Sequence, residues 1–534
     1  MKKYIFVTGG VCSSLGKGVT ATSIGNLLEN RGLEIRMIKI DPYLNVDAGT
    51  MSPYQHGEVY VTDDGTETDL DLGNYARFTN SPLGKLNSIT TGQIYQEVIK
   101  KEREGRYLGR TVQVIPHITD EIKRRIFLAS DGDNVDITII EVGGTVGDIE
   151  SIPFLEAARQ FIHDIGKNNT LFIHLTLIPE VAGGELKTKP TQHSVNKLRE
   201  IGIQPDILVC RSPEFLEKEV INKISLFTNV QEKSIISAYD VKTSVYEIPL
   251  IFHKQNLDNI VLDKLNLKKP NGNLSKWESI VKILKTADKT INIGLVGKYI
   301  NLNDSYKSIN EAIYHGGIAN KVKINLIKID AEDLENSNPE EIFDTIDGIL
   351  IPGGFGQRGI NGMVEAVKFA RIKNIPCFGI CLGMQVMVIE YARNILGLEF
   401  ADSTEFTPET KHPVISLLEE QKGMHTMGGT MRLGKSKSIL VRGTNIHKIY
   451  NTTEIWERHR HRYEVSADYT AELKKSGLVF SAFTPDDNLV ESVEWSNHPW
   501  SIGVQFHPEF ISTPIQPHPL FIDFIRASID YATL

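Results

Sequence analysis

The chain has 534 residues, more than one ordinary domain holds, so two or three domains are expected. Hydrophobic residues make up 41% and charged residues 23%, a composition typical of globular proteins that excludes disordered, collagen-like and membrane-spanning classes. The net charge of −9 argues against a general nucleic-acid binder, which needs a basic surface. We therefore expect neither nucleic acid nor membrane as a partner, and any nucleotide in a local site.

The first ten residues, MKKYIFVTGG, contain an apolar run too short for a signal sequence or a membrane span. The four cysteines, at positions 12, 210, 377 and 381, are too few for a disulfide framework and match no zinc-ligand spacing. These features predict a first buried strand and a reducing, cytoplasmic environment.

Short β-rich apolar runs alternate with helical patterns through the first half of the chain. The runs cover residues 4–8, 36–40, 135–140, 171–177 and 207–210. This alternation is typical of a parallel sheet with crossover helices. It predicts an α/β domain of the doubly wound, P-loop type over residues 1–267.

A linker and a second series of strands follow. Residues 265–290 combine a Lys, Pro, Gly and Asn cluster with one amphipathic helix. The later apolar runs cover residues 291–296, 348–351, 376–380 and 501–506, and we find no internal repeat or heptad pattern. The sequence thus predicts tandem α/β domains over 1–267 and 291–534, joined by a linker over 268–290.

A glycine-rich turn, GGVCSSLGKG, follows the first predicted strand and leads into a predicted helix. Backbone amides and the helix amino terminus there would face a polyphosphate, which Lys17 could reach. Gly10 lies six residues before Gly16 where the standard P-loop has five, and Gly18 replaces the Ser or Thr that normally holds magnesium. The motif predicts a nucleotide phosphate site, with a structural glycine turn as the alternative.

Carboxylates must bind the metal if Gly18 cannot, because magnesium prefers oxygen ligands and needs only one or two from the protein. Glu141 follows a predicted strand, at the edge where doubly wound sheets bind ligands. Asp71 lies in the acidic segment VTDDGTETDLDLGNYARF, whose composition alone favours a solvated loop over a metal site.

Two basic positions have open interpretations. Lys39 ends the second apolar run and is either a surface charge or a phosphate contact. The segment KTKPTQHSV, residues 187–195, either binds an anion at a helix start or is a basic loop.

The chain resembles the CTP synthase family in three long segments, which read DPYLNVDAGTMSPYQHGEVYVTDDGTETDLDLGNYARF, IEVGGTVGDIES and KTKPTQHSVNKLREIGIQPDILVCRS. The resemblance extends over essentially the whole chain, as an amidoligase domain followed by a glutaminase domain. It also implies a P-loop of the dethiobiotin-synthetase-like branch, in which the unusual spacing is expected.

The resemblance implies roles in the first domain. Magnesium would be bound by Asp71 and Glu141, Lys39 would assist phosphoryl transfer, and residues 56–58 would gate the passage of ammonia. The implied ATP contacts are Ser14, Leu15, Gly16, Lys17, Gly18, Val19, Asp71 and Val241. The implied UTP contacts, overlapping an inhibitory CTP site, are Ser13, Asp148, Ile149, Glu150, Lys187, Thr188, Lys189, Pro190, Thr191, Gln192 and Lys223.

The second domain contains PCFGICLGMQ, in which Gly379, Cys381 and Gly383 form a GxCxG version of the nucleophile elbow. Small neighbours permit a sharp strand-to-helix turn with Cys381 at its apex, and a helix amino terminus and a nearby imidazole both favour the thiolate. Cys377, on the preceding apolar run, is expected in the core.

The segment GVQFHPEF places His507 and Glu509 after a predicted strand, where they could complete a Cys, His and Glu triad. A lone histidine is more often structural, but this one accompanies the cysteine elbow and an upstream LIPGGFG. In that segment Gly353 and Gly354 would supply backbone donors to an oxyanion hole.

These motifs resemble class I glutamine amidotransferases, and RHRHRYEV resembles the version found in CTP synthases. Arg358 falls in a region that the family links to GTP activation. The resemblance implies glutamine contacts by Gly354, Leu382, Gly383, Met384, Gln385, Glu405 and Arg462.

The implied reaction is the ATP-dependent amination of UTP to CTP with ammonia from glutamine, activated by GTP and inhibited by CTP in a homotetramer. One alternative is another glutamine-fed ligase of the same branch, such as a cobyrinate diamide synthase. The other is a nucleotide-switched partition or structural protein, which would have no use for a triad.

Overall fold

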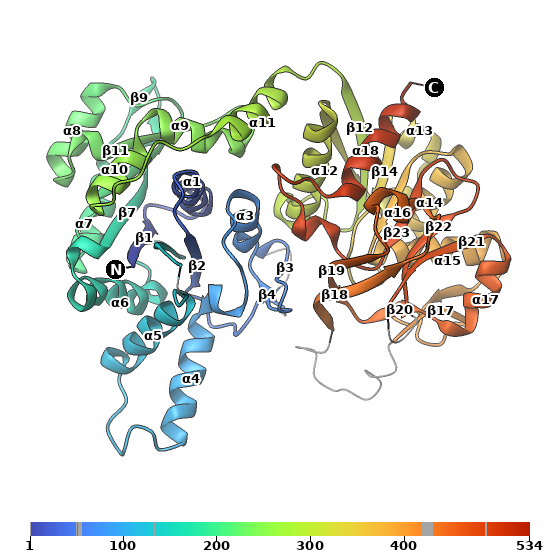
Figure 1. Ribbon diagram of the computed structural model, residues 1–534, viewed down its shortest axis with the longest axis horizontal. Helices are drawn as coiled ribbons and strands as arrows, with labels where there is room; N and C mark the ends of the chain where they lie inside the picture. Colours follow the sequence, from blue (N-terminus) through green and yellow to red (C-terminus); the bar gives the residue numbers. More distant parts are fainter. Residues whose placement is uncertain are drawn as a thin grey trace. The chain divides into compact units, whose positions relative to one another are not determined.

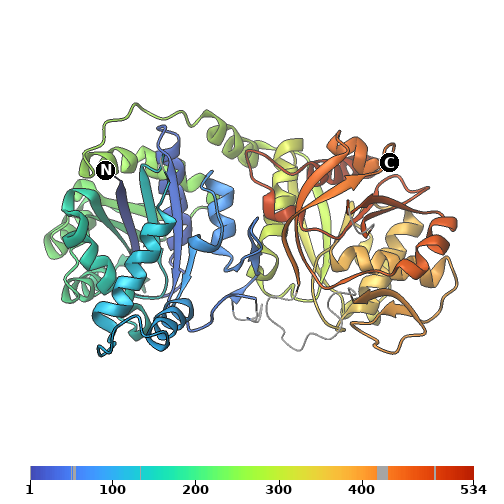
Figure 2. The ribbon, with the colours of Figure 1, turned by 60° about the horizontal axis from the view of Figure 1, so that its bottom comes forward.

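The chain divides by its internal contacts into two units, one of Met1–Ala48 and Asp71–Lys282 and the other of Gly49–Leu70 and Ile283–Leu534. The computed structural model describes residues 2–49, 51, 56–132, 134–417, 431–485 and 489–533 (Figures 1 and 2). Residues 49–70 come from the first half of the sequence but group with the second unit.

The first unit contains a wholly parallel sheet with the order β11-β10-β7-β1-β6-β2-β5. The strands predicted from apolar runs are confirmed, with ends displaced by at most two residues, whereas β5 and β11 were not predicted. The strands are β1 (Lys3–Gly9), β2 (Ile35–Asp41), β5 (Ser88–Thr90), β6 (Ile137–Val142), β7 (Thr170–Leu177), β10 (Ile207–Ser212) and β11 (Ile235–Tyr239).

Helices cover both faces of this sheet (Figure 1). Tyr4 and Phe6 of β1 point into an apolar cluster beneath α4, α5 and α6, while α1, α3, α9 and α10 lie over the other face. This doubly wound arrangement leaves the carboxyl ends of β1, β2 and β6 open for a ligand. The helices are α1 (Lys17–Glu29), α3 (Asp71–Phe78), α4 (Thr91–Arg103), α5 (Thr119–Ala129), α6 (Ile152–Ile165), α7 (Lys189–Glu200), α8 (Lys218–Thr228), α9 (Ile248–Lys254), α10 (Leu257–Lys264) and α11 (Ser275–Thr286), which extends into the second unit.

The second unit has a mixed sheet with the order β13-β12-β14-β15-β23-β22-β21-β18-β19. The first five strands are parallel, and four of them match the predicted runs, whereas β13 was not predicted. The other four strands are antiparallel. The parallel strands are β12 (Thr290–Gly297), β13 (Lys323–Asp330), β14 (Gly348–Ile351), β15 (Cys377–Ile380) and β23 (Ser501–Val504). The antiparallel strands are β18 (Arg432–Leu440), β19 (Glu454–His461), β21 (Leu478–Phe483) and β22 (Val490–Trp495).

Helices also sandwich this second sheet. α12 and α18 pack together on one face, and α14 and α15 pack together on the other. The helices are α12 (Lys307–Asn320), α13 (Pro339–Phe343), α14 (Ile360–Lys373), α15 (Leu382–Asn394), α16 (Asn445–Tyr450), α17 (Ala467–Lys475) and α18 (Pro519–Tyr531). A small sheet is formed by β16 (Ala401–Ser403), β17 (His412–Leu417) and β20 (Tyr463–Val465).

The structure also describes two short hairpins. The first joins β3 (Tyr60–Val61) to β4 (Glu67–Thr68) within the second unit. The other joins β8 (Glu180–Val181) to β9 (Glu185–Leu186), just before α7.

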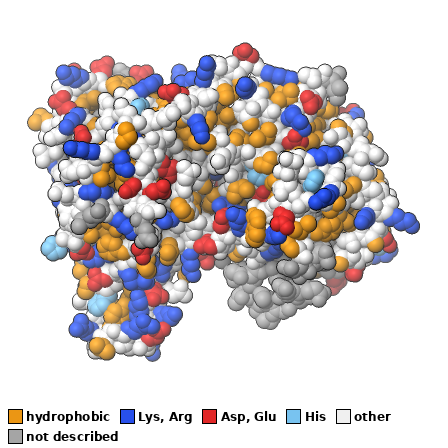
Figure 3. All heavy atoms as spheres, in the orientation of Figure 1, with side chains coloured by type: hydrophobic (Ala, Val, Ile, Leu, Met, Phe, Trp, Pro, Cys, Tyr) orange, Lys and Arg blue, Asp and Glu red, His pale blue; other side chains and the backbone are white. Residues whose placement is uncertain are grey.

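Basic side chains gather at the carboxyl end of α4 and in the turn that follows it (Figure 3). They include Arg103 of α4 and, in the turn, Arg106 and Arg110, and all three are exposed. Among the helices that the structure describes, none is both long and apolar enough to cross a membrane.

Candidate active sites

Cys381 lies between β15 and α15, at the sharp turn that the GxCxG spacing predicts. Its φ is 52°, and its N–H donates to the carbonyl of Val504 at 2.7 Å. A Cβ at Gly383 would lie 2.1 Å from the carbonyl oxygen of Ile351, and one at Gly379 would lie 2.7 Å from the Gly383 backbone. Only glycine fits at positions 379 and 383, because the strained turn leaves no room for a Cβ beside the neighbouring backbone.

His507 and Glu509 follow β23, and Glu509 lies in the 3₁₀ turn Pro508–Ile511. Nδ1 of His507 lies 2.7 Å from Oε1 of Glu509. Burial lowers the pKa of His507, but the negative charges of Glu509 and Cys381 outweigh burial and raise it to about 10. Nε2 of His507 has no hydrogen-bond partner among the described residues, so it remains available for proton transfer.

The loop after β14 closes over the cysteine and histidine. A Cβ at Gly353 would lie 2.9 Å from Cε1 of His507 and 3.6 Å from Cβ of Cys381. Such close approach of bare backbone is what an oxyanion hole requires, and any side chain at Gly353 would displace the imidazole.

A cavity of about 530 Å³ opens beside these groups. Its polar wall includes both an acid, Glu405, and a base, Arg462. Burial raises the pKa of Glu405, which accepts a hydrogen bond from the Gly356 N–H at 2.7 Å. Groups of opposite charge beside a nucleophile suit an α-amino acid, whose ammonium and carboxylate need opposite partners. The cavity also brings together the predicted Cys381, His507, Glu509, Gly353 and Gly354.

The first turn of α15 supports the elbow and does not line the cavity. The side chain of Met384 is fully buried in the apolar core beside Leu382. Gln385 donates to the carbonyl of Tyr463 at 2.8 Å and contacts Gln505 at 3.3 Å. Of the predicted glutamine contacts 382–385, only backbone groups are therefore left for a substrate.

Cys377 is buried on β15, as expected. Burial raises the pKa of its thiol, so this cysteine is an inert part of the core.

Lys298 belongs to none of the motifs that the sequence presents. It follows β12, is almost completely buried, and donates to the carbonyls of Phe355 and Gly356. Burial lowers the pKa of Lys298 to about 8, although Glu405 opposes that shift. Its ammonium thus fixes the loop that carries Gly353 and Gly354, and its position at a strand end was the only signal in the sequence.

In the first unit, the glycine-rich turn connects β1 to α1 with an unusual backbone. Val11, Ser14 and Gly16 have φ values of 81°, 57° and 91°. In the part of the chain that the structure describes, no side chain caps α1, so its first N–H groups are left for an anion. Lys17 lies beside them and donates to the carbonyl of Gly144 at 2.8 Å. Burial lowers the pKa of Lys17, although Glu141 opposes this effect.

Lys39 and the carboxylates of Asp41, Asp71 and Glu141 converge at the carboxyl ends of β2 and β6. Lys39 is buried, pairs with Asp71 and lies 3.5 Å from Oε1 of Glu141, which excludes its interpretation as a surface charge. Asp71 is the first residue of α3 and not part of a solvated loop. Tyr75 donates to Oε2 of Glu141 at 2.5 Å.

A Cβ at Gly18 would lie 2.7 Å from Oδ1 of Asp71 and 3.6 Å from Oε2 of Glu141. The Asp71 carboxylate therefore occupies the space that a Ser or Thr at Gly18 would need. No group of three or more metal-ligating side chains occurs in the described ranges, but magnesium needs only one or two carboxylates beside phosphate and water oxygens. The paired carboxylates thus fit this ion.

The predicted adenine contact, Val241, follows β11 next to the glycine-rich turn between β1 and α1. Arg211 bridges the two segments, because it donates to Asp240 at 2.8 Å and to the carbonyl of Leu15 at 3.5 Å. The predicted pyrimidine contact Ser13 is exposed in the same loop.

The predicted segment 187–192 lies at the amino terminus of α7, where the side chains divide into two groups. Thr188, Thr191 and Gln192 are buried, and Thr191 and Gln192 bond to neighbouring oxygens. Lys189 is exposed beside α8, whose Lys223 is also exposed. The predicted contacts Asp148, Ile149 and Glu150 are exposed just before α6.

Comparisons with known proteins agree with this geometry. The family model described as CTP synthase N-terminus matches residues 3–267, and the one described as glutamine amidotransferase class-I matches residues 301–527. A CTP synthase of Aquifex aeolicus is 57% identical over 532 residues, and the alignment covers 99% of each chain. A CTP synthase of Clostridium acetobutylicum is 55% identical over 527 residues, which cover 98% of each chain.

A solved structure, the Trypanosoma brucei CTPS glutaminase domain with bound acivicin, is 40% identical to this chain. It covers 45% of this chain and 94% of its own, with a TM-score of 0.43. The full-length relatives match both halves of the sequence in order. The chain therefore belongs to the CTP synthase family.

Proposed function

We propose that the two sites carry out the two halves of the CTP synthase reaction. The chain is a glutamine-hydrolysing ligase, as its family membership shows, and this excludes the alternative ligase and partition-protein interpretations. One observation supports this assignment of sites. One unit has a Cys, His and Glu triad beside a cavity that suits a zwitterion, and the other unit has a glycine-rich phosphate loop beside two carboxylates.

In the second unit, the Cys381 thiolate attacks the side-chain carboxamide carbon of glutamine. The Gly353 and Gly354 N–H groups stabilise the oxyanion, and His507 gives its proton to the departing nitrogen, which leaves as ammonia. Water then attacks the thioester with His507 as base, releasing glutamate and the thiol. Glu509 orients the imidazole throughout, while Glu405 and Arg462 hold the α-amino and α-carboxylate groups.

In the first unit, O4 of UTP accepts the γ-phosphoryl group of ATP and so becomes a leaving group, which ammonia displaces as phosphate. Lys17 and the amides of residues 14–19 hold the ATP phosphates, and Lys39 compensates charge at the transferred group. Asp71 and Glu141 would hold Mg²⁺, which neutralises phosphate charge when bound.

The remaining nucleotide contacts follow from the same assignment. Val241 would contact adenine, and residues 13, 148–150, 187–192 and 223 would form the UTP site and the overlapping CTP-inhibitor site. The amidoligase domain would span residues 1–267, the linker 268–290 and the amidotransferase domain 291–534, in line with the two matching family models.

Regulation and assembly are proposed from the family. We expect GTP to activate the glutamine reaction through the region of Arg358, residues 56–58 to gate ammonia, and the chain to form a homotetramer. The four cysteines are free thiols, which suits a reducing cytoplasm.

The direct test is CTP formation from UTP, ATP and Mg²⁺, with glutamine or ammonium as the nitrogen source and GTP present or absent. We expect synthesis from both sources, dependent on UTP, with GTP stimulating only the glutamine reaction. Glutamate release without CTP would point to another acceptor.

Gly18→Ala tests the proposed metal site. The added methyl carbon would lie 2.7 Å from Oδ1 of Asp71 and would therefore displace that carboxylate. Synthesis from either nitrogen source should then fall by about 10-fold or more. Glutamate release from glutamine should not change. Gly25→Ala, in the same helix, is the matched control: its methyl group would crowd Thr79 at 3.0 Å and Met37 at 3.3 Å but not Asp71, so it should lower stability and retain synthesis. Equal behaviour of the two variants would contradict the role given to Gly18.

A further inference from the structure

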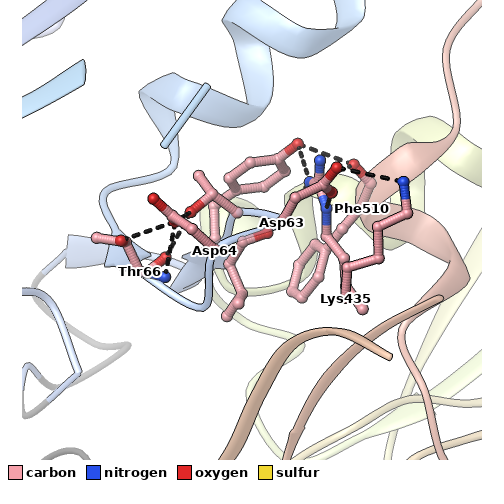
Figure 4. Close-up of polar contacts among 9 residues, drawn as sticks. Asp63, Asp64, Thr66, Lys435 and Phe510 are labelled. Carbon is pink, nitrogen blue, oxygen red and sulfur yellow. Dashed lines mark hydrogen bonds and ion pairs between the residues drawn. The ribbon is translucent and has the colours of Figure 1, made fainter. Parts of the chain in front are cut away.

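The hairpin of β3 and β4 is closed by its own side chains. Asp64 accepts hydrogen bonds from the Thr62 hydroxyl at 2.5 Å and from the Thr66 N–H and hydroxyl at 3.2 and 2.9 Å (Figure 4). Gly65 completes the turn with a φ of 80°. This local closure gives the hairpin a defined shape with Asp63 at its tip.

The hairpin tip packs directly on the backbone of β18. Gly434 has a φ of 84°, and a Cβ there would lie 2.6 Å from the Gly65 nitrogen. The Lys435 N–H donates to the carbonyl of Asp63 at 3.0 Å. Gly65 and Gly434 let the two backbones approach closely, and a backbone hydrogen bond joins them. The hairpin therefore docks at a defined place on β18.

Arg458 of β19 is the centre of this contact. Its Nε donates to Oδ1 of Asp63 at 2.7 Å, and its Nη1 donates to the Tyr60 hydroxyl at 2.6 Å and the Val61 carbonyl at 3.1 Å. The guanidinium also lies over the Tyr60 ring, 5.3 Å from its centroid. The hairpin therefore holds the guanidinium in one orientation from several sides.

The same residues reach the triad histidine. The His507 N–H donates to the carbonyl of Arg458 at 2.8 Å. The Tyr60 hydroxyl donates to the Phe510 carbonyl at 2.8 Å, and the Phe510 ring stacks on His507 with centroids 5.1 Å apart. His507 is thus supported through its backbone and through its ring by groups that the hairpin contacts.

The triad cysteine has a parallel support two residues along β19. The carbonyl of Arg460 accepts from Sγ of Cys381 at 3.8 Å, and Nε of Arg460 donates to Glu67 of the hairpin at 2.9 Å. Residues two apart on a strand point to the same face, so Arg458 and Arg460 both face the hairpin. β19 is an edge strand of its sheet, and among the described residues no strand pairs with its outer edge.

We infer that the β3–β4 hairpin is a positioning element of the thiol amidase and that it acts through Arg458. It fixes the edge strand whose Arg458 carbonyl holds His507 and whose Arg460 carbonyl lies beside Cys381, and so sets the distance between nucleophile and base. This inference rests on the proposed hydrolysis of glutamine by Cys381. Displacing reacting groups by about 1 Å costs roughly 100-fold in rate, so an edge strand without this support would lose turnover.

The test is steady-state glutamine hydrolysis by the full chain with Asp63→Asn and, separately, Tyr60→Phe. Each variant should lower kcat by about 10-fold, because each removes one charged or buried hydrogen bond to Arg458. KM for glutamine should stay within about twofold, since Glu405 and Arg462 are untouched, and ammonium-dependent synthesis should be unchanged. The double variant should lose less than the product of the single losses, because both changes act on the same guanidinium.

Lys435→Gln is the matched control, because the Lys435 ammonium pairs with the same Asp63 carboxylate at 3.4 Å on the exposed side. Lys435 is the cross-strand partner of Arg458, and the substitution keeps its backbone hydrogen bond to Asp63. It should keep kcat within about twofold of the parent chain. Asp63→Glu should recover part of the loss, and the rate of Cys381 alkylation by iodoacetamide should follow kcat across the series.

Two results would overturn the inference. In the first, kcat for glutamine hydrolysis by Asp63→Asn and Tyr60→Phe is the same as that of Lys435→Gln. In the second, glutamine-dependent and ammonium-dependent synthesis fall equally in Asp63→Asn and in Tyr60→Phe. A parent chain that does not hydrolyse glutamine would instead refute the proposed function itself. The two failures are therefore distinguishable.

Discussion

Cys381→Ala is expected to abolish CTP synthesis from glutamine and to leave synthesis from ammonium at the level of the parent chain. The variant removes the atom that attacks the carboxamide, so no thioester forms and no ammonia is released. The phosphate loop and carboxylates of the first unit are unaffected. Loss of a nucleophile in such a triad costs about 10⁶-fold in turnover, so residual glutamine-dependent synthesis should be undetectable.

CTP formation with each nitrogen source, measured in parallel with glutamate release, checks this prediction. Cys377→Ala is the control, since this thiol lies on the strand that leads to Cys381 but is buried in the core. It should lower stability by about 1 kcal/mol and retain both activities. A Cys381→Ala chain that loses both syntheses equally would contradict the division of labour between the units.

Lys17→Ala is expected to lower synthesis from either nitrogen source by about 10² to 10³-fold, because it removes a charge that holds the ATP phosphates as phosphoryl transfer proceeds. Glutamine hydrolysis should continue, since Cys381, His507 and Glu509 remain in place. The measurement is CTP formation from ammonium at saturating UTP, together with glutamate release.

Lys276→Ala is the control for that variant, because Lys276 is an exposed lysine on α11. Its synthesis should match that of the parent chain. If Lys17→Ala made CTP from ammonium at the parent rate, Lys17 would not be a contact of the ATP phosphates.

Local patterns in the sequence predicted much of the fold and of the second site. The spacing of Gly379, Cys381 and Gly383 requires a sharp strand-to-helix turn, and the structure has one there. Most of the parallel strands were also predicted, because both of their faces are buried and they form continuous apolar runs. The parallel edge strands β5, β11 and β13 were not predicted. β18 and β19 were missed because one of their faces is polar, as in RLGKSKSIL, so no apolar run marks them.

Contacts between distant segments could not be predicted from local pattern. Asp63 and Arg458 are neighbours in space but far apart in the chain, and nothing in either segment specifies the other. Lys39 stayed ambiguous for the same reason, because its interpretation depends on burial between Asp71 and Glu141. The absence of a hydroxyl at Gly18 was visible in the sequence, but the carboxylate that occupies its space was not.

The grouping of residues 49–70 with the second unit makes this protein less modular than its tandem motifs imply. Cutting the chain in the linker would separate the hairpin from the amidotransferase half. It would also expose Tyr60 on the amidoligase half, because the surface that buries Tyr60 belongs to the other half. Exchanging halves between relatives would also join a hairpin from one parent to Gly434 and Arg458 from another. Successful exchange therefore requires the hairpin and the strands β18 and β19 to come from the same parent.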